Sequence, residues 1–198
     1  FEGQIGRNYS PKNYDGRTRG LITLRKALQG SLNIPAVKTL YLVGVREAIK
    51  FGQRFGYTTL NENAGLSLVL GGSEVTLFEH TAAYATLANN GVYNAPVSIL
   101  KVTDPTGQIL YEWKQSPGQE AIRSELAATI SDVLSDNASR AYIFGSNSTL
   151  TLPGREVAAK TGTTNDNKDA WTMGYVPSLT TGVWVGNTIP SPMKSGGN

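Results

Sequence analysis

Three short runs near the C-terminal end constrain the fold of this chain more than any other feature. They span residues 157–163, 170–176 and 181–186, and each has the length and composition of a β-strand. The segments between them are short and carry residues that favour turns, Asn165 to Asp169 and then Pro177-Ser178. Strands joined so closely usually pair with their neighbours in sequence, so the sequence predicts an antiparallel meander.

Helical patterns precede these strands. Thr23 is expected to cap a short helix that Gly30 ends, and Pro35 is expected in the first turn of a second helix. Further helices are predicted over 46–55, 76–90 and 124–136, the last with Ser124 as its N-cap, and a loop over 138–154. Two strands, 97–102 and 108–113, read as a hairpin across a turn at 104–107. The predicted class is α+β, an antiparallel sheet flanked by helices.

Composition excludes several kinds of protein. The chain has 198 residues and a net charge of +3, without the basic cluster that nucleic-acid binding requires, so no nucleic-acid partner is expected. The absence of cysteine and the single histidine, His80, exclude a thiolate nucleophile and a metal site built from Cys or His. His80 itself is interpreted as a hydrogen-bonded structural residue of its helix. The longest apolar stretches are far shorter than the roughly 20 residues of a membrane span.

One candidate site lies in the first strand, as Lys160-Thr161-Gly162-Thr163. A glycine inside a strand costs stability and often marks a place where another backbone or a ligand approaches closely. A lysine between small residues and two hydroxyls suits a substrate carboxylate. The alternative is an exposed edge strand on which the lysine only prevents aggregation.

A second candidate site is the polar corner Ser31-Leu32-Asn33, between the first two predicted helices. Polar side chains at a corner can point outward, because they need not satisfy a helix interior. The same spacing recurs at Ser135-Asp136-Asn137, but there it closes a helix and is interpreted as terminating residues.

These residues carry a family resemblance. The segments LRKALQGSLNIPAVKTLYLVG, residues 24–44, and VAAKTGTTNDNKDAWTMGYVP, residues 157–177, resemble the transpeptidase domain of class A (bifunctional) penicillin-binding proteins. Gly71-Gly72-Ser73 and the helix after Thr76 are also similar to the family. The resemblance implies the penicillin-binding transpeptidase (serine β-lactamase-like) fold, incomplete at both ends of this chain.

The resemblance also implies roles at the matching positions. Ser31 would relay a proton to the leaving amine, and Asn33 would hold the substrate amide. Lys160 would favour the terminal carboxylate of the donor peptide and tune the Ser31 hydroxyl. Thr161 and Thr163 would bind that carboxylate beside Gly162, with the Thr163 backbone N–H as an oxyanion donor, and the peptide would lie along the strand as an added β-strand.

The chain departs from the family pattern at the nucleophile. The family's Ser-x-x-Lys should precede Ser31, and no such string is found there. A literal match, Ser191-Pro192-Met193-Lys194, lies in the tail, where the order along the chain is wrong. The nucleophile is therefore expected upstream of Phe1, with the first strands of the sheet, and the closing helix beyond Asn198.

The implied activity is that of a peptidoglycan DD-transpeptidase, which transfers acyl groups from D-Ala-D-Ala stem peptides through a serine acyl-enzyme and is inhibited by β-lactams. The resemblance implies no metal and no organic cofactor. Two alternatives stay open: a non-catalytic module that binds such peptides or β-lactams, and a serine β-lactamase or antibiotic sensor. The implied location is the extracytoplasmic face of the bacterial membrane, with the anchor and a glycosyltransferase domain upstream.

The chain is expected to form part of a transpeptidase domain with six segments. These are an irregular approach (1–22), a mainly helical part with the Ser-x-Asn corner (23–96), an accessory hairpin (97–113), a helix and loop (114–154), the sheet strands with Lys-Thr-Gly (155–187) and a tail (188–198).

Overall fold

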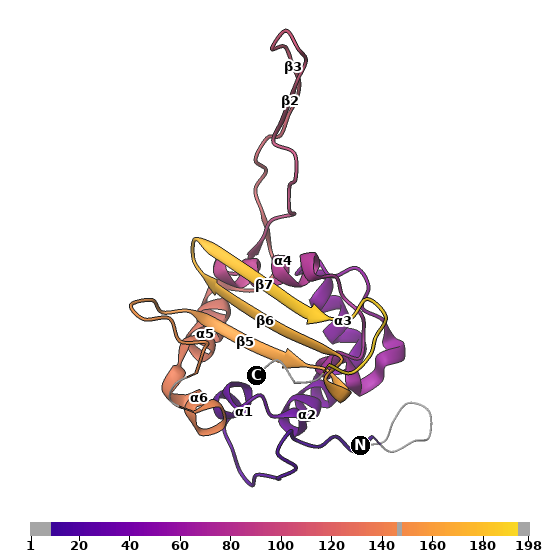
Figure 1. Cartoon of the computed structure of the whole chain (residues 1–198), viewed down its shortest axis with the longest axis vertical. Helices are drawn as coiled ribbons and strands as arrows, with labels where there is room; N and C mark the ends of the chain where they lie inside the picture. Colours follow the sequence, from indigo (N-terminus) through magenta and orange to yellow (C-terminus); the bar gives the residue numbers. More distant parts are fainter. Residues whose placement is uncertain (1–8, 146–147, 194–198) are drawn as a thin grey trace.

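A three-stranded antiparallel sheet forms the centre of the molecule (Figure 1). The computed structural model describes residues 9–145 and 148–193. Strands β5 (Ala158–Thr163), β6 (Asp169–Val176) and β7 (Leu179–Gly186) follow one another in the order β5-β6-β7. Lys160 pairs with Met173 and Gly162 with Trp171 across the first two strands. The predicted meander is confirmed, and β5 is an edge strand among the described residues.

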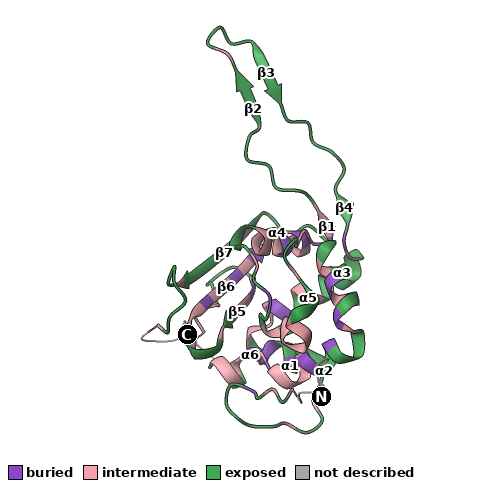
Figure 2. Ribbon diagram, turned by 90° about the vertical axis from the view of Figure 1, so that its right-hand side faces the viewer, coloured by how far each residue is buried: buried purple, intermediate pink, exposed green. Residues whose placement is uncertain are grey.

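Helices cover one face of this sheet (Figures 1 and 2). The bounds of the helices are α1 Leu24–Gln29, α2 Asn33–Val43, α3 Val45–Gln53, α4 Leu77–Ala88, α5 Ser124–Ser135 and α6 Asn137–Phe144, with 3-10 segments η1 Glu62–Leu70 and η2 Asn165–Asn167. The core lies where α4 and α5 meet the sheet. Met173 of β6 is almost fully buried there, and Tyr175 packs edge-on against Tyr84 of α4. The predicted α+β class, an antiparallel sheet flanked by helices, is therefore confirmed.

Helix boundaries agree with the sequence predictions in part. The Thr23 side chain accepts a hydrogen bond from the Lys26 amide and caps α1 as predicted. Helix α2 begins at Asn33, two residues before Pro35, so Asn33 belongs to the helix rather than to the corner. Ser124 was predicted as the N-cap of α5 but is its first helical residue, after Arg123.

The predicted loop over 138–154 is wrong at its start, because α6 occupies Asn137–Phe144. The side chain of Asp136 accepts a hydrogen bond from the Ser139 amide, so this residue caps the helix that follows it. The sequence analysis assigned Asp136 and Asn137 to the end of α5. Asp and Asn are common both before and after helices, so these two residues do not show by themselves that a new helix begins. The result is two helices joined at a single residue.

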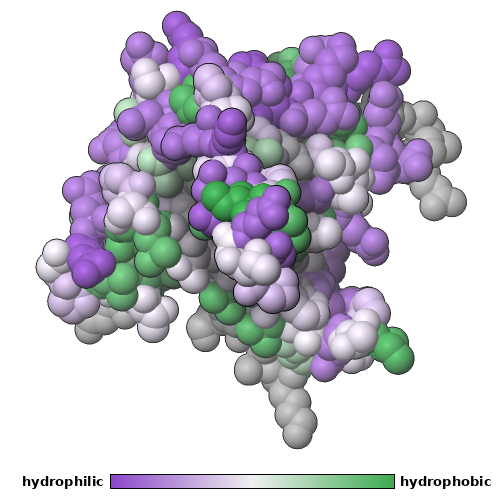
Figure 3. All heavy atoms as spheres, turned by 90° about the horizontal axis from the view of Figure 1, so that it is seen from above, coloured by the Kyte–Doolittle hydropathy of each residue, from purple (hydrophilic) through white to green (hydrophobic). Residues whose placement is uncertain are grey.

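The predicted hairpin projects from the molecule as a long arm (Figure 2). Its strands β2 (Lys101–Thr103) and β3 (Ile109–Glu112) are shorter than predicted, and β1 (Val92–Tyr93) pairs with β4 (Gln119–Glu120) at its base. The Asp104 carboxylate accepts hydrogen bonds from the Thr106 and Gln108 amides and fixes the turn. Seen from above in Figure 3, polar and apolar side chains are mixed on the arm, which points toward the viewer. None of the described helices is both long and apolar enough to cross a bilayer.

Candidate active site

The corner between α1 and α2 has an unusual backbone at Ser31. Two hydrogen bonds close the end of α1, from the Ser31 amide to the Leu28 carbonyl at 3.0 Å and from the Leu32 amide to the Ala27 carbonyl at 3.0 Å. In this type of helix ending, the residue whose amide donates the first of these bonds has a left-handed backbone conformation and is usually glycine. Here it is Ser31, with φ of 49°. The chain thus places a hydroxyl at a position where a side chain costs free energy.

Lys160 of β5 reaches this corner. Its ammonium donates a hydrogen bond to the Ser31 hydroxyl at 2.7 Å and another to the Thr161 carbonyl at 2.6 Å. The two residues lie 129 positions apart in the sequence. The lysine strand and the serine corner, which were singled out separately, therefore meet as two sides of one site.

The surroundings make Lys160 a stronger acid than an ordinary lysine. Burial of the ammonium, with a smaller effect from the nearby Arg140 cation, lowers the pKa of Lys160 to about 8. Burial disfavours the charged form, and a like charge does the same. A lysine with such a pKa can exchange protons near neutral pH, which a lysine at its usual value cannot do readily.

The residues after Lys160 alternate across the sheet. Gly162 lies on the same face as Lys160, while Thr161 and Thr163 lie on the other, since successive residues of a strand point to opposite faces. Thr161 is half-buried, and Gly162 and Thr163 are exposed. A methyl group built on Gly162 would meet only the Trp171 side chain, at 3.7 Å. No described protein atom therefore requires a glycine at this position.

Asn33 is held by the approach segment. Its side-chain amide donates a hydrogen bond to the Lys12 carbonyl at 2.9 Å. The neighbouring Asn13 is buried and accepts a hydrogen bond from the Ile34 amide at 3.1 Å, so it ties the same segment to the start of α2. Asn33 thus has a structural partner at the beginning of the helix, two residues after Ser31.

Other strings that match the motifs lie elsewhere. Ser135 donates a hydrogen bond to the Glu156 carboxylate at 2.8 Å and ends α5, in agreement with its interpretation as a terminating residue. The Ser-x-x-Lys match in the tail, which begins at Ser191, is described only as far as Met193, and Lys194 lies outside the described residues.

A further Ser-x-x-Lys match, which the sequence analysis missed, begins at Ser98 in the exposed arm and ends at Lys101, the first residue of β2. His80 is hydrogen-bonded to the Tyr57 hydroxyl at 2.6 Å and packs against Tyr84 and Trp171.

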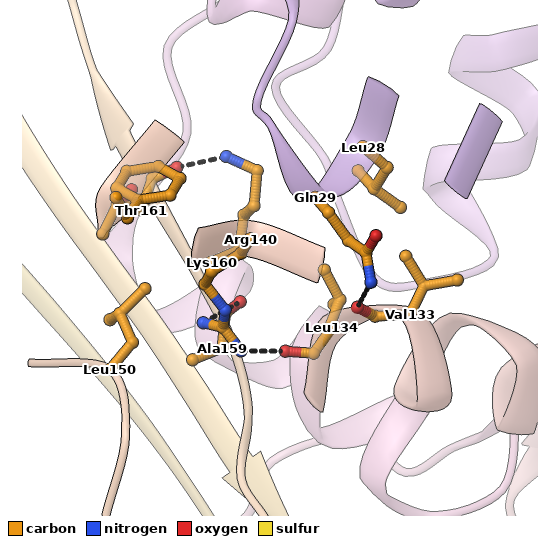
Figure 4. A pocket seen from close by; sticks show the side chains of 10 residues that line it. Leu28, Gln29, Val133, Leu134, Arg140, Leu150, Ala159, Lys160 and Thr161 are labelled. Atoms are coloured by element: carbon orange, nitrogen blue, oxygen red, sulfur yellow. Dashed lines mark hydrogen bonds between the residues drawn. The ribbon is translucent and has the colours of Figure 1, made fainter. Parts of the chain in front are cut away.

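Helix α6, which the sequence analysis did not predict, packs against the end of α1 and against β5 next to the site. The Tyr142 hydroxyl donates a hydrogen bond to the Lys26 carbonyl at 2.6 Å and lies where a Cβ on Gly30 would stand. Arg140 is buried and lines a pocket that reaches Lys160 and Thr161 (Figure 4). The available signal was the polar start of α6 at Asp136, which was assigned to the preceding helix. Within the described residues no cluster of acidic or histidine side chains could hold a metal ion.

Comparison with known proteins places the chain in a family. The model of the penicillin-binding protein transpeptidase domain matches residues 2–198. The chain belongs to the penicillin-binding protein transpeptidase family. Penicillin-binding protein 1A of Aquifex aeolicus is 38% identical over 193 residues, which is 96% of this chain and 25% of that protein. Penicillin-binding protein 1A of Neisseria flavescens is 34% identical over 200 residues, 99% of this chain and 25% of that protein.

Solved penicillin-binding proteins share the fold. PonA1 of Mycobacterium tuberculosis superposes with a TM-score of 0.81 at 29% identity, over 92% of this chain and 52% of that one. Penicillin-binding protein 1A of Haemophilus influenzae superposes with a TM-score of 0.78 at 26% identity, over 98% of this chain and 34% of that one. The resemblance to class A penicillin-binding proteins is therefore confirmed, and the chain spans about a quarter of the length of its curated relatives.

Proposed function

We propose that this penicillin-binding chain forms the carboxylate-binding and proton-relay part of a peptidoglycan DD-transpeptidase. The observation that carries the proposal is the 2.7 Å hydrogen bond between the Lys160 ammonium and the Ser31 hydroxyl. It joins a cation suited to a peptide carboxylate with a hydroxyl able to pass on a proton. Membership of the transpeptidase family supports the proposal, and so does PonA1 of Mycobacterium tuberculosis, which was solved in complex with penicillin V and is 30% identical to this chain.

In this proposal a serine of the complete protein, within a Ser-x-x-Lys motif upstream of Ser31, gives its proton to the lysine of that motif and attacks the D-Ala-D-Ala carbonyl. The proton of the Ser31 hydroxyl passes to the departing amine of D-Ala, and Lys160 replaces it from its ammonium. The acyl-enzyme is then attacked by an amine of a second stem peptide. Splitting the transfer into two steps through a covalent intermediate makes each step easier.

The substrate strand lies along β5 in this proposal. β5 is an edge strand of the described sheet, so its outer N–H and C=O groups can pair with an added peptide. The terminal carboxylate lies at the outer edge of β5, where Lys160 meets it from one face of the sheet and the Thr161 and Thr163 hydroxyls from the other, and the Thr163 amide serves as one oxyanion donor. Asn33 exchanges its bond with Lys12 for the substrate amide. The proposed setting is the outer face of a bacterial membrane, with an anchor and a glycosyltransferase domain elsewhere in the complete protein.

The proposal is tested by the rate at which labelled penicillin acylates the complete protein. We expect Lys160→Ala to slow acylation by about 100-fold or more, because the carboxylate loses its cation and Ser31 its proton donor. Lys168→Ala, which removes a partly exposed lysine on the turn after β5, should leave the rate unchanged. Equal rates for Lys160→Ala and the parent protein would overturn the proposal, whereas reversible binding with no covalent label would favour the non-catalytic module.

A further inference from the structure

Arg140 is a buried cation held by carbonyl groups. It lies on α6 and is only 4% exposed. Its guanidinium donates a hydrogen bond to the Leu134 carbonyl at 2.7 Å and a longer one to the Ala159 carbonyl at 3.5 Å. Within the part of the chain that the structure describes, no carboxylate forms an ion pair with it. A buried charge that no carboxylate contacts directly is costly, so packing alone does not explain an arginine at this position.

The two carbonyl groups place Arg140 beside the strand residue that precedes Lys160. Leu134 is near the C-terminal end of α5, and Ala159 precedes Lys160 in β5. Arg140 therefore links a helix end to the strand at the residue before the site. In Figure 4 both cations line one pocket, among apolar side chains that include Leu134 and Leu150.

Few groups face the Lys160 ammonium. The Ser31 hydroxyl and the Thr161 carbonyl accept its hydrogen bonds, and Arg140 acts on it through space. Asp136, at the start of α6, is near enough to offset part of the Arg140 charge, and its pKa is lowered chiefly by hydrogen bonds at Ser139. No carboxylate of the described residues forms an ion pair with Lys160. Arg140 is thus the charged side chain that acts on Lys160 most directly.

We propose that Arg140 is a positioning residue of the transpeptidase site, which holds β5 in place through the Ala159 carbonyl and makes the Lys160 ammonium a better proton donor to Ser31. The inference rests on the proposed function. In the relay the Lys160 N–H bond breaks and a bond forms between that proton and the Ser31 oxygen, as the Ser31 proton moves to the departing amine. Lys160 is left neutral and regains a proton from water. A lower pKa of the Lys160 ammonium favours this proton transfer.

The test separates the charge of Arg140 from its hydrogen bonds. In the complete protein, Arg140→Gln removes the charge but keeps an amide donor, Arg140→Met removes both, and Arg140→Lys keeps the charge. Lys114→Met removes one positive charge from the exposed chain after β3 and is the control. Two readouts are used: the pH profile of acylation by labelled penicillin, and the pH dependence of Lys160 acetylation by trace acetic anhydride, followed by mass spectrometry. The second reports the ionisation of Lys160 without any acyl transfer.

We expect Arg140→Gln and Arg140→Met to raise the acetylation pKa of Lys160 by about one unit, as loss of a nearby like charge should. The alkaline limb of the acylation profile should move up by the same amount, and the rate on the plateau should fall by about tenfold. Arg140→Lys and Lys114→Met should keep the parent's pH profiles. Folding of each variant is checked by its thermal transition.

Unchanged Lys160 profiles in folded Arg140→Gln or Arg140→Met would overturn the inference. Equal loss of acylation in Arg140→Lys and Arg140→Gln, with no shift in either profile, would also overturn it by leaving a purely structural role. The proposed function can fail separately. It is wrong if labelled penicillin does not acylate the parent protein, even where the acetylation pKa of Lys160 rises as expected in Arg140→Gln and Arg140→Met.

Discussion

Ser31 has a backbone conformation that residues with side chains rarely adopt. A left-handed residue other than glycine costs roughly 1–2 kcal/mol, and Ser31, with φ of 49°, occupies the place in the α1 ending that glycine usually fills. The hydroxyl gains a hydrogen bond from Lys160 in return. A site that needs a hydroxyl at a sharp corner therefore accepts a local loss of stability, as strained positions near functional groups often do.

The strain at Ser31 leads to a prediction about stability and activity together. Ser31→Gly and Ser31→Ala both remove the hydroxyl, but only glycine relieves the backbone. We expect the free energy of unfolding, measured by urea denaturation, to be about 1 kcal/mol higher for the Ser31→Gly variant than for the Ser31→Ala variant. Both variants should lose most of the acylation rate. An alanine variant as stable as the glycine variant would show that Ser31 is not strained.

At the scale of elements, α6 holds the end of α1 in place. Gly30 has an ordinary backbone conformation, so its small size matters rather than its flexibility. A Cβ at Gly30 would overlap the Tyr142 hydroxyl, which is bonded to the Lys26 carbonyl. The corner that presents Ser31 is thus positioned by a tyrosine from a helix far away in the sequence.

This contact between α1 and α6 can be tested with a double-mutant cycle. Gly30→Ala should lower the free energy of unfolding by about 1–3 kcal/mol, because it overpacks the contact. In a Tyr142→Ala background the same change should cost much less, so the two effects should not add. Additive effects would contradict the contact. Gly162→Ala is the comparison: the methyl group has room in the protein and should leave stability nearly unchanged.

The sequence was sufficient for the elements that carry strong local signals. The meander, α1 with its Thr23 cap and the arm with its Asp104 turn are set by strand patterns, caps and turn residues that act over a few positions. Helix α6 was missed because Asp136 serves as a cap for the helix after it while also following the end of α5. Arg140 could not be found, because its partners are carbonyl groups of residues that only the fold brings near.

On the scale of the whole molecule, the site joins the two ends of the chain. The corner at Ser31 belongs to the first helices and Lys160 to the sheet near the C-terminal end, with α4, the projecting arm and α5 between them (Figure 1). Family membership is shown over residues 2–198 and the fold is shared with PonA1 over 92% of the chain, whereas the proposed role of the Ser31–Lys160 pair depends on one hydrogen bond. The account therefore depends on these two residues acting as a unit.

A double-mutant cycle on acylation of the complete protein by labelled penicillin tests this dependence most directly. If Lys160 supplies its proton through Ser31, the variant carrying both Ser31→Ala and Lys160→Ala should react about as slowly as the slower single variant, because residues that act together are strongly non-additive. If the two losses instead multiply, Ser31 and Lys160 contribute independently, and the relay through their hydrogen bond is wrong.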